Sequence, residues 1–298
     1  MAEVNLRASL SRDVGRMLYL ATWALADIAA NIGLQRVVRF NQFGVDSHAY
    51  WLVWHGPMYT GGPVTPTSTG PNPFLYSPAF AQLMWPGAQL PWPLFAAGFA
   101  IVDVVLLVWL LYPLGWRWVL PLGLALSPEV LFGNIFIPLA AMAVVGFRYP
   151  AAWAFSALTK VAPTVMPVWW LVRREWRQLT MWAGTTLAIA ALSAALTPAL
   201  WAQWVRHLAA WAAQSGRMLG SASMVPLLYR APAGLLLVVV GAWRGRRWTV
   251  PVAALLCTPV FWLGSLAWLT AIPRLEGVGR ERTARLSVSG ASCDDVVG

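Results

Sequence analysis

Charged residues are scarce in this chain, because Asp, Glu, Lys and Arg together make up only 11% of its 298 residues. Soluble domains carry roughly a quarter charged residues. Hydrophobic residues account for 59% of the chain, and the mean hydropathy is +0.61. These values exclude an ordinary soluble domain. They predict an all-α, multispanning integral membrane protein.

Acidic residues are the scarcer of the two charge types, with 11 Asp and Glu against 21 Lys and Arg and a net charge of +10. Such a balance can indicate nucleic-acid binding, but here the arginines fall between apolar segments and not on one soluble face. They occur at Arg117, Arg148, Arg173-Arg174 and Arg244–Arg247. This is the positive-inside pattern of a multispanning protein. We therefore expect membrane lipids, and no nucleic acid, among its partners.

Cysteine and histidine are nearly absent. The two cysteines, Cys257 and Cys293, offer neither a disulfide nor a zinc pattern. The three histidines, His48, His55 and His207, match none of the established zinc spacings. We expect no metal and no other cofactor.

Lysine occurs once, as Lys160, while the other cationic side chains are arginine. This bias is typical of a GC-rich bacterial genome, and Lys160 lies inside an apolar segment next to a break at Pro163. An ionisable residue within the membrane is by default a candidate functional residue. One interpretation of Lys160 is a phosphate contact. The other is an ion pair with Asp27, Asp103 or Glu129.

Charge is almost missing from residues 44–92, which follow the first apolar segment. Asp46 is the one formal charge between Arg39 and Asp103. Aromatic side chains fill the rest of the stretch, and such residues favour the membrane–water boundary. They include Trp51, Trp54, Tyr59, Phe74, Tyr76, Phe80, Trp85 and Trp92. Asp46 is a candidate general base on this shelf; alternatively, it caps a short surface helix.

Apolar patterning predicts about nine membrane segments, several of them short hairpin limbs. These are residues 17–34, 93–112, 118–131, 135–145, 151–158, 164–171, 181–196, 225–243 and 249–272. Residues 1–272 would form one transmembrane domain, with 44–92 and 200–224 on the outer face. The first segment could pass for a signal peptide, but Asp27 and the lack of a clean cleavage site favour a retained helix. We expect residues 273–298 to be a disordered polar tail. Its arginines favour the inner side of the membrane, whereas the number of preceding segments places it on the outer side.

Several short motifs, taken together, resemble glycosyltransferase family 87, which has the GT-C fold and uses polyprenyl-phosphate sugars. The motifs are Asp46–Tyr50, Phe74–Phe80, Gly133-Asn134, Leu158–Pro163 and Arg173–Trp176. The resemblance extends over about residues 20–270. It implies transfer of a hexose, most readily mannose, to a lipid or glycan hydroxyl on the outer face of the bacterial plasma membrane, with inversion.

The same resemblance implies roles for individual residues. Asp46 would take the proton from the acceptor hydroxyl, and Lys160 would contact the donor phosphate. Tyr50, Tyr76 and Asn134, which lie in the matching motifs, are further candidate substrate contacts. On the residues alone, His48 is a candidate hydrogen-bonding neighbour of Asp46 or an acceptor contact, and Arg206 and Arg217 are candidate phosphate contacts. For the arginines, and for Arg230, the default is that the side chain reaches the lipid headgroups.

The chain departs from the family pattern at several positions. It has Gly133-Asn134 where the family usually has Gly-Gln, and residues 258–265 lack the histidines often found in a late helix. A transporter or flippase of a lipid-linked sugar would also have broken helices and an intramembrane cation. That class predicts two related halves, and no second half is evident. A non-catalytic relative of the family is the third hypothesis.

Overall fold

The computed structural model describes residues 2–59, 73–214 and 225–277, and within these ranges the regular structure is entirely helical. The chain starts with α1 (Ala2–Phe40), α2 (Val45–Leu52), α3 (Pro78–Ala88), α4 (Trp92–Leu111) and η1 (Tyr112–Leu114). It continues with α5 (Trp116–Ala125), α6 (Ser127–Phe132), α7 (Phe136–Val145), η2 (Pro150–Ala152), α8 (Trp153–Thr159) and α9 (Met166–Val172). The last elements are α10 (Trp176–Leu196), α11 (Pro198–Gln214), α12 (Leu227–Trp243), α13 (Thr249–Cys257) and η4 (Leu263–Ala271). The predicted all-α class is confirmed.

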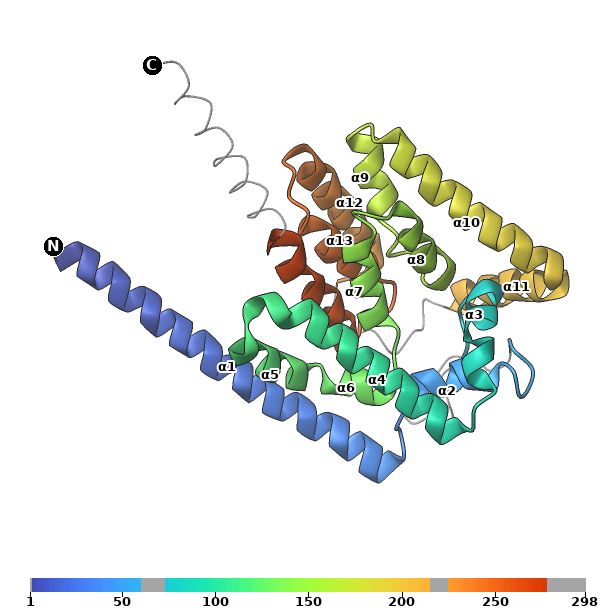
Figure 1. Cartoon of the computed structure of the whole chain (residues 1–298), viewed down its shortest axis with the longest axis horizontal. Coiled ribbons are helices and arrows are strands. Elements are labelled where there is room, and N and C mark those ends of the chain that lie inside the picture. Colours follow the sequence, from blue (N-terminus) through green and yellow to red (C-terminus); the bar gives the residue numbers. More distant parts are fainter. Residues whose placement is uncertain (1, 60–72, 215–224, 278–298) are drawn as a thin grey trace, which may run out of the picture.

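Three helical segments are long and apolar enough to cross a membrane: Asp13–Phe40, Trp92–Leu114 and Trp176–Leu196. In the first and third, only 11% and 6% of the most apolar window is buried inside the protein. Such apolar yet uncovered surface is expected where helices face lipid. These spans indicate an integral membrane protein, with α1 and α10 along its outside (Figure 1).

The core of the protein lies around α7, the ten-residue helix near the centre of Figure 1. Seven of its residues are buried, and it packs against η4, α4 and α8. The connection that precedes α7 is a short turn. Gly133 adopts a left-handed conformation, with φ of 67°, and this glycine ends α6 just before α7 begins.

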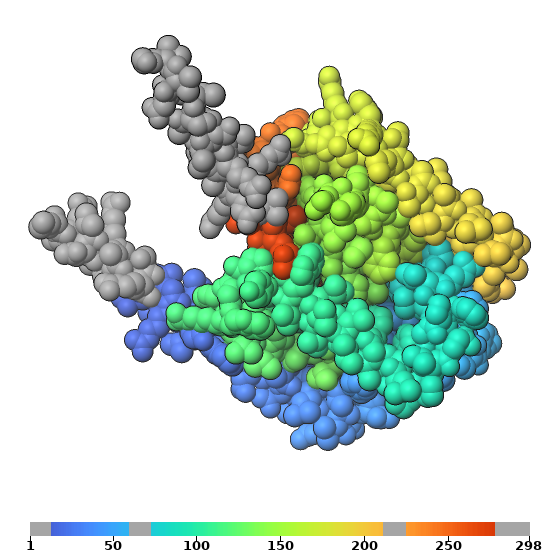
Figure 2. Space-filling view, in the orientation of Figure 1, coloured from blue at the N-terminus to red at the C-terminus, as the bar shows by residue number. Residues whose placement is uncertain are grey.

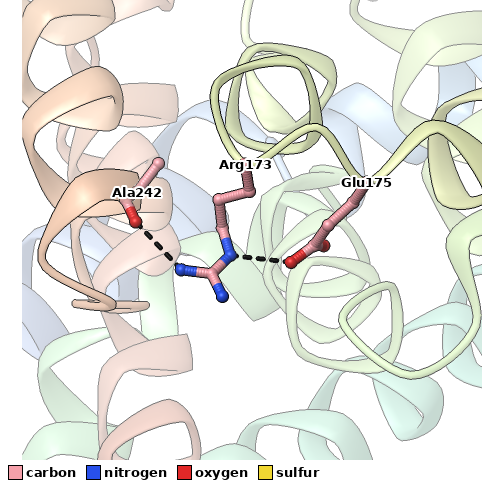
Figure 3. A network of polar contacts seen from close by, with 3 residues as sticks. All are labelled: Arg173, Glu175 and Ala242. Carbon is pink, nitrogen blue, oxygen red and sulfur yellow. Dashed lines mark hydrogen bonds and ion pairs between the residues drawn. The ribbon is translucent and has the colours of Figure 1, made fainter.

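Arginine-rich turns gather at one end of the molecule. Arg173 donates a hydrogen bond of 3.1 Å to the carbonyl of Ala242 at the end of α12, and also pairs with Glu175 (Figure 3). The guanidinium of Arg247 lies 5.1 Å from the ring centroid of Phe147, so the turn after α7 belongs to the same end. This clustering agrees with the positive-inside pattern.

Residues 44–59, residues 73–92 and α11 lie at the opposite end. α10 starts beside Arg173 and its 21 residues span ~30 Å, about one hydrocarbon thickness, before α11 begins. The Trp204 indole on α11 donates a 3.1 Å hydrogen bond to the carbonyl of Leu75. Figure 2 shows the surfaces of these two parts adjoining. The described parts of the two segments therefore share one end of the protein, and their placement on the outer face stays a prediction.

The prediction of one helix over residues 249–272 is wrong. The helix ends at Cys257, and after a non-helical stretch containing Pro259 the chain continues as η4. Proline removes a backbone donor and breaks the helical ladder. α13 and η4 pack on each other as a further pair of short limbs.

The tail prediction also needs correction. Residues 272–277 are helical, and Leu275 is buried. Arg274 donates a 2.5 Å hydrogen bond to the carbonyl of Trp109, in the last turn of α4. Since α13 and η4 form a pair of limbs, the chain returns at η4 toward the arginine-rich end (Figure 1). The number of limbs and the positive charge of Arg274 then favour the same side for residues 272–277. Residues 278–298 lie outside the described residues.

Candidate active site

Asp46 lies in the first turn of α2, and α2 is docked onto the end of α6. The N–H of Gly44 donates a 2.7 Å hydrogen bond to the carbonyl of Leu131. Gly44 has a φ of 63°, and a Cβ there would come within 2.8 Å of the Trp92 ring, so only glycine fits. Gly44 is also the N-cap of α2 and makes no side-chain cap bond. The alternative that Asp46 caps this helix is therefore wrong.

Asp46 is bonded instead to Asn134, which is 88 residues away in the sequence. The Asn134 Nδ2 donates a 2.8 Å hydrogen bond to Asp46 Oδ2, and its Oδ1 accepts one of 2.7 Å from the N–H of Ile135. Gly133 allows this approach, because a Cβ at that position would overlap the Ser47 hydroxyl. The side chain of Asn134 is thus fixed at both of its polar atoms.

Lys160 reaches the same amide from the other side. It is the C-cap residue of α8, with extended backbone, and its Nζ lies 3.5 Å from Asn134 Oδ1. The Nζ also lies 3.5 Å from the ring centroid of Phe136, a cation–π distance. One amide group therefore separates the carboxylate of Asp46 from the ammonium of Lys160, with its N–H₂ toward the anion and its carbonyl toward the cation.

The ion pairs considered for Lys160 do not form within 4 Å among the described residues. Asp27 accepts a 3.1 Å hydrogen bond from Asn31 on the exposed α1. Both carboxyl oxygens of Asp103 are buried and lack a hydrogen-bond partner in the described part of the chain. Glu129 is within electrostatic range of Lys160, as is Asp46.

Tyr50 and Tyr76 form a hydroxyl pair beside Lys160. Their oxygens are 3.1 Å apart, and the Tyr76 ring centroid is 5.9 Å from the Lys160 Nζ. Burial raises the pKa of both phenols well above their usual value, and the negative charge of Asp46 adds to this in each case. Both hydroxyls therefore keep their protons at neutral pH and remain available as donors.

Ser77 holds the Tyr76 segment against α8. Its hydroxyl donates a 2.5 Å hydrogen bond to the carbonyl of Leu158, two residues before Lys160. The Tyr59 hydroxyl donates one of 3.0 Å to the carbonyl of Tyr76. The Ser77-Pro78 sequence predicts a helix start, and α3 does begin there; nothing in the sequence reveals the bond to α8.

Two other predicted contacts, His48 and Arg206, are not brought into this cluster. The His48 ring lies 4.2 Å from the ring of Trp92, and burial lowers its pKa. Arg206 is exposed on α11 and donates to Ala202 of its own helix. Arg217 lies outside the described residues.

Arg230 differs from its expected position at the lipid headgroups. It is buried, and its guanidinium donates to four backbone carbonyls. These belong to Val225, Leu256, Thr258 and Pro259. Arg230 therefore holds the interruption between α13 and η4 together.

A cavity of about 360 Å³ lies between α3, α7, α8 and α10, next to the Lys160 break. Its lining is apolar except for Thr159, the residue before Lys160. The lining includes Phe80, Leu83, Met142, Phe155, Leu158 and Ile189. An apolar cavity of this kind can accept a hydrocarbon chain.

Residues 74–273, about two thirds of the chain, match glycosyltransferase family 87. The chain belongs to glycosyltransferase family 87. Comparison with curated proteins and with solved structures returned no match. Family membership makes the protein a glycosyltransferase and leaves its donor, sugar and acceptor to be determined.

The matched range of this glycosyltransferase contains Tyr76, Asn134 and Lys160 and begins after Asp46. Asp46 joins the other residues through the hydrogen bond to Asn134 and not through the match. Among the described residues, no group of three His, Cys, Asp or Glu side chains is arranged to hold a metal ion.

Proposed function

We propose that this glycosyltransferase moves a hexose, most readily mannose, from a polyprenyl-phosphate sugar to a hydroxyl of a lipid or glycan acceptor, with inversion. The reaction would take place on the outer face of the bacterial plasma membrane, in a GT-C-like bundle of about nine membrane segments. The observation that carries the proposal is the row of Asp46, Asn134 and Lys160, which sets a carboxylate and an ammonium on two sides of one amide.

In this proposal Asp46 accepts the proton of the acceptor hydroxyl as its oxygen attacks the anomeric carbon. The bond between that carbon and the phosphate oxygen breaks, and its electron pair leaves with the polyprenyl phosphate. Lys160 stabilises the negative charge that grows on the departing phosphate, which favours the transition state over the ground state. The hydroxyls of Tyr50 and Tyr76 are placed to donate to the sugar or phosphate.

The apolar cavity supports a lipid-linked donor over a nucleotide sugar. It places hydrocarbon-lined space beside Thr159, so a prenyl chain can lie there while its phosphate reaches Lys160. A nucleotide would need a polar, phosphate-cradling site, and the sequence has no glycine-rich phosphate loop.

The test is an assay of the purified full-length protein in nanodiscs with radiolabelled donors. We would compare polyprenyl-phosphate mannose, polyprenyl-phosphate glucose and GDP-mannose, each with a membrane-lipid extract as acceptor, and with empty nanodiscs as control. We expect label to enter a lipid or glycan product from a polyprenyl-phosphate sugar alone. The proposal would be contradicted if GDP-mannose served as donor, or if none of the three donors supported transfer.

A transporter or flippase is the second candidate, favoured by the interruption between α13 and η4. This is a broken limb pair in the C-terminal part of the chain, where none was expected. Proteoliposomes loaded with a fluorescent polyprenyl-phosphate sugar distinguish the two. Movement of the lipid between leaflets without a glycosylated product would support transport.

A further inference from the structure

Glu129 lies directly behind the turn that carries Asn134. It is in the first turn of α6, and 2% of its surface is exposed. Its backbone carbonyl accepts hydrogen bonds from two successive N–H groups of the turn, Gly133 at 3.1 Å and Asn134 at 3.3 Å. The backbone of the turn is therefore anchored on Glu129.

The side chain of Glu129 reaches the helix on the other side of the turn. Its carboxyl group lies close to the backbone N–H of Phe136, the first residue of α7. The centroid of the Phe136 ring lies 3.5 Å from the Lys160 Nζ. Glu129 is also within electrostatic range of both Asp46 and Lys160. The backbone of Glu129 thus holds the turn that carries Asn134, and its carboxyl group lies beside Phe136, whose ring is next to Lys160.

A distant glycine makes room for this carboxyl group. Gly264 is near the start of η4, and a Cβ built there would overlap Glu129 Oε2. The other oxygen, Oε1, is buried without a hydrogen-bond partner among the described residues. A buried carboxyl group with an unpaired oxygen costs free energy, so its retention calls for an explanation.

We propose that Glu129, held in place by Gly264, is a positioning residue: it fixes Asn134 and Phe136, and through them the relative placement of Asp46 and Lys160. This inference rests on the proposed function, because it gives Glu129 a part in the same reaction. It also gives residues 258–265 a role here, since their Gly264 closes the back of the site.

The test compares variants of the full-length protein in nanodiscs. Glu129→Leu removes both oxygens, whereas Glu129→Gln keeps an oxygen that can accept from Phe136. Gly264→Ala pushes on the carboxyl group from outside, and Glu129→Ala combined with Gly264→Ala relieves that overlap. Two controls match these changes. Asp27→Asn alters an exposed carboxyl group on α1, and Gly123→Ala adds a methyl group where nothing lies within 4 Å.

We expect Glu129→Leu and Gly264→Ala to lower turnover by roughly 10- to 100-fold, because ångström-scale misplacement of reacting groups costs this much. Glu129→Gln should keep most of the wild-type turnover, whereas the double variant lacks the carboxyl group and should stay as slow as Glu129→Leu. The amides of Gly133 and Asn134 should exchange hydrogen faster in the two damaging variants. Both controls should resemble the wild type in turnover and exchange.

Two results would overturn the inference. One is a folded Glu129→Leu or Gly264→Ala protein with exchange unchanged and turnover within about twofold of wild type. The other is a Glu129→Gln protein as slow as Glu129→Leu. If Glu129→Leu does not fold, Gly264→Ala decides, and a double variant that recovers wild-type turnover would overturn the inference. If the wild type transfers no sugar, the proposed function fails, and hydrogen exchange still shows whether Glu129 holds the turn.

Discussion

The interruption between α8 and α9 and the interruption between α13 and η4 both contain a proline, Pro163 and Pro259. Lys160 is part of the first interruption, and Arg230 lies beside the second. At the second interruption, Arg230 donates four hydrogen bonds to backbone carbonyls. An arginine has five N–H donors. Nearly all of the hydrogen-bonding capacity of Arg230 is therefore used by the fold.

At the first interruption the backbone is satisfied without the lysine ammonium. The N–H of Lys160 bonds to the Ser156 carbonyl, the Thr164 hydroxyl donates to the Lys160 carbonyl, and Ser77 bonds to Leu158. Within the described residues, the one hydrogen bond of the Lys160 Nζ is the 3.5 Å contact to Asn134. Non-helical backbone at membrane depth needs partners. A cation that does not serve that need remains available to bind an anion.

The largest expected effect concerns the end of the protein shared by residues 44–59 and α11, and it is all-or-none. In a background lacking Cys257 and Cys293, we would place single cysteines at the exposed positions Gly56, Gln203 and Arg246. Gly56 and Gln203 variants should react with an impermeant maleimide in intact cells, and Arg246 should react only after lysis. Labelling of just one of the first two would contradict the arrangement.

Asp46→Asn should abolish most transfer. Asparagine keeps the size of the side chain and can still accept from Asn134, but it cannot take up the acceptor proton. Loss of a general base typically lowers the rate roughly 10²- to 10⁴-fold. Melting temperature and donor binding should stay near wild type. Turnover above about half of wild type would exclude Asp46 as the base.

Lys160→Met should weaken donor binding by about 2–5 kcal/mol, the cost of truncating one partner of a buried charge pair. The melting temperature should not fall, because no ion pair within 4 Å is lost among the described residues. Donor titration and thermal unfolding in detergent measure the two effects. A destabilised Lys160→Met protein that Glu129→Gln rescues, and that still binds donor, would show that Lys160 serves as a counter-ion.

Arg230→Met should give the opposite result and so sharpen the comparison. It leaves four carbonyls without their donor, and each unsatisfied buried group costs about 1–3 kcal/mol before relaxation. We expect a loss of stability of about 3 kcal/mol, with donor affinity of the folded protein unchanged. Thermal unfolding with donor titration is again the measurement. A normal melting temperature with weak donor binding would mean that Arg230, too, serves the ligand.

The smallest expected effect is a pH dependence of stability from His48, on the shelf away from both interruptions. Burial lowers its pKa, so the folded protein prefers the neutral ring. This contribution is present above the ordinary pKa of about 6.5 and is lost as the pH falls below it. As the pH is lowered from 7.5 to 5, the melting temperature should fall less in His48→Phe than in wild type. Equal slopes would show that His48 does not contribute.

Local patterns in the sequence predicted the interruptions after Phe132 and Thr159, since Gly133-Asn134 and Pro163 act on their own backbone. They did not predict the interruption after Cys257, because residues 249–272 are apolar enough for one span and their carbonyls find a donor, Arg230, on another helix. The tail was misjudged for a similar reason. Arg274 is polar and Leu275 is apolar, so this short stretch shows no helical pattern of its own. Arg274 is held by its hydrogen bond to α4, and Leu275 is buried in the core.

The sequence by itself determined that this is a helical membrane protein, and it singled out Asp46 and Lys160. Charge is so costly in an apolar chain that an isolated acid and a single lysine stand out without any coordinates. Only the tertiary structure decided that Asn134 joins the two, that Glu129 and Gly264 lie behind that joint, and that Arg230 belongs to the fold. These relations connect residues from 26 to well over 100 positions apart, and hydrogen bonds depend on ångström distances that composition and periodicity do not encode.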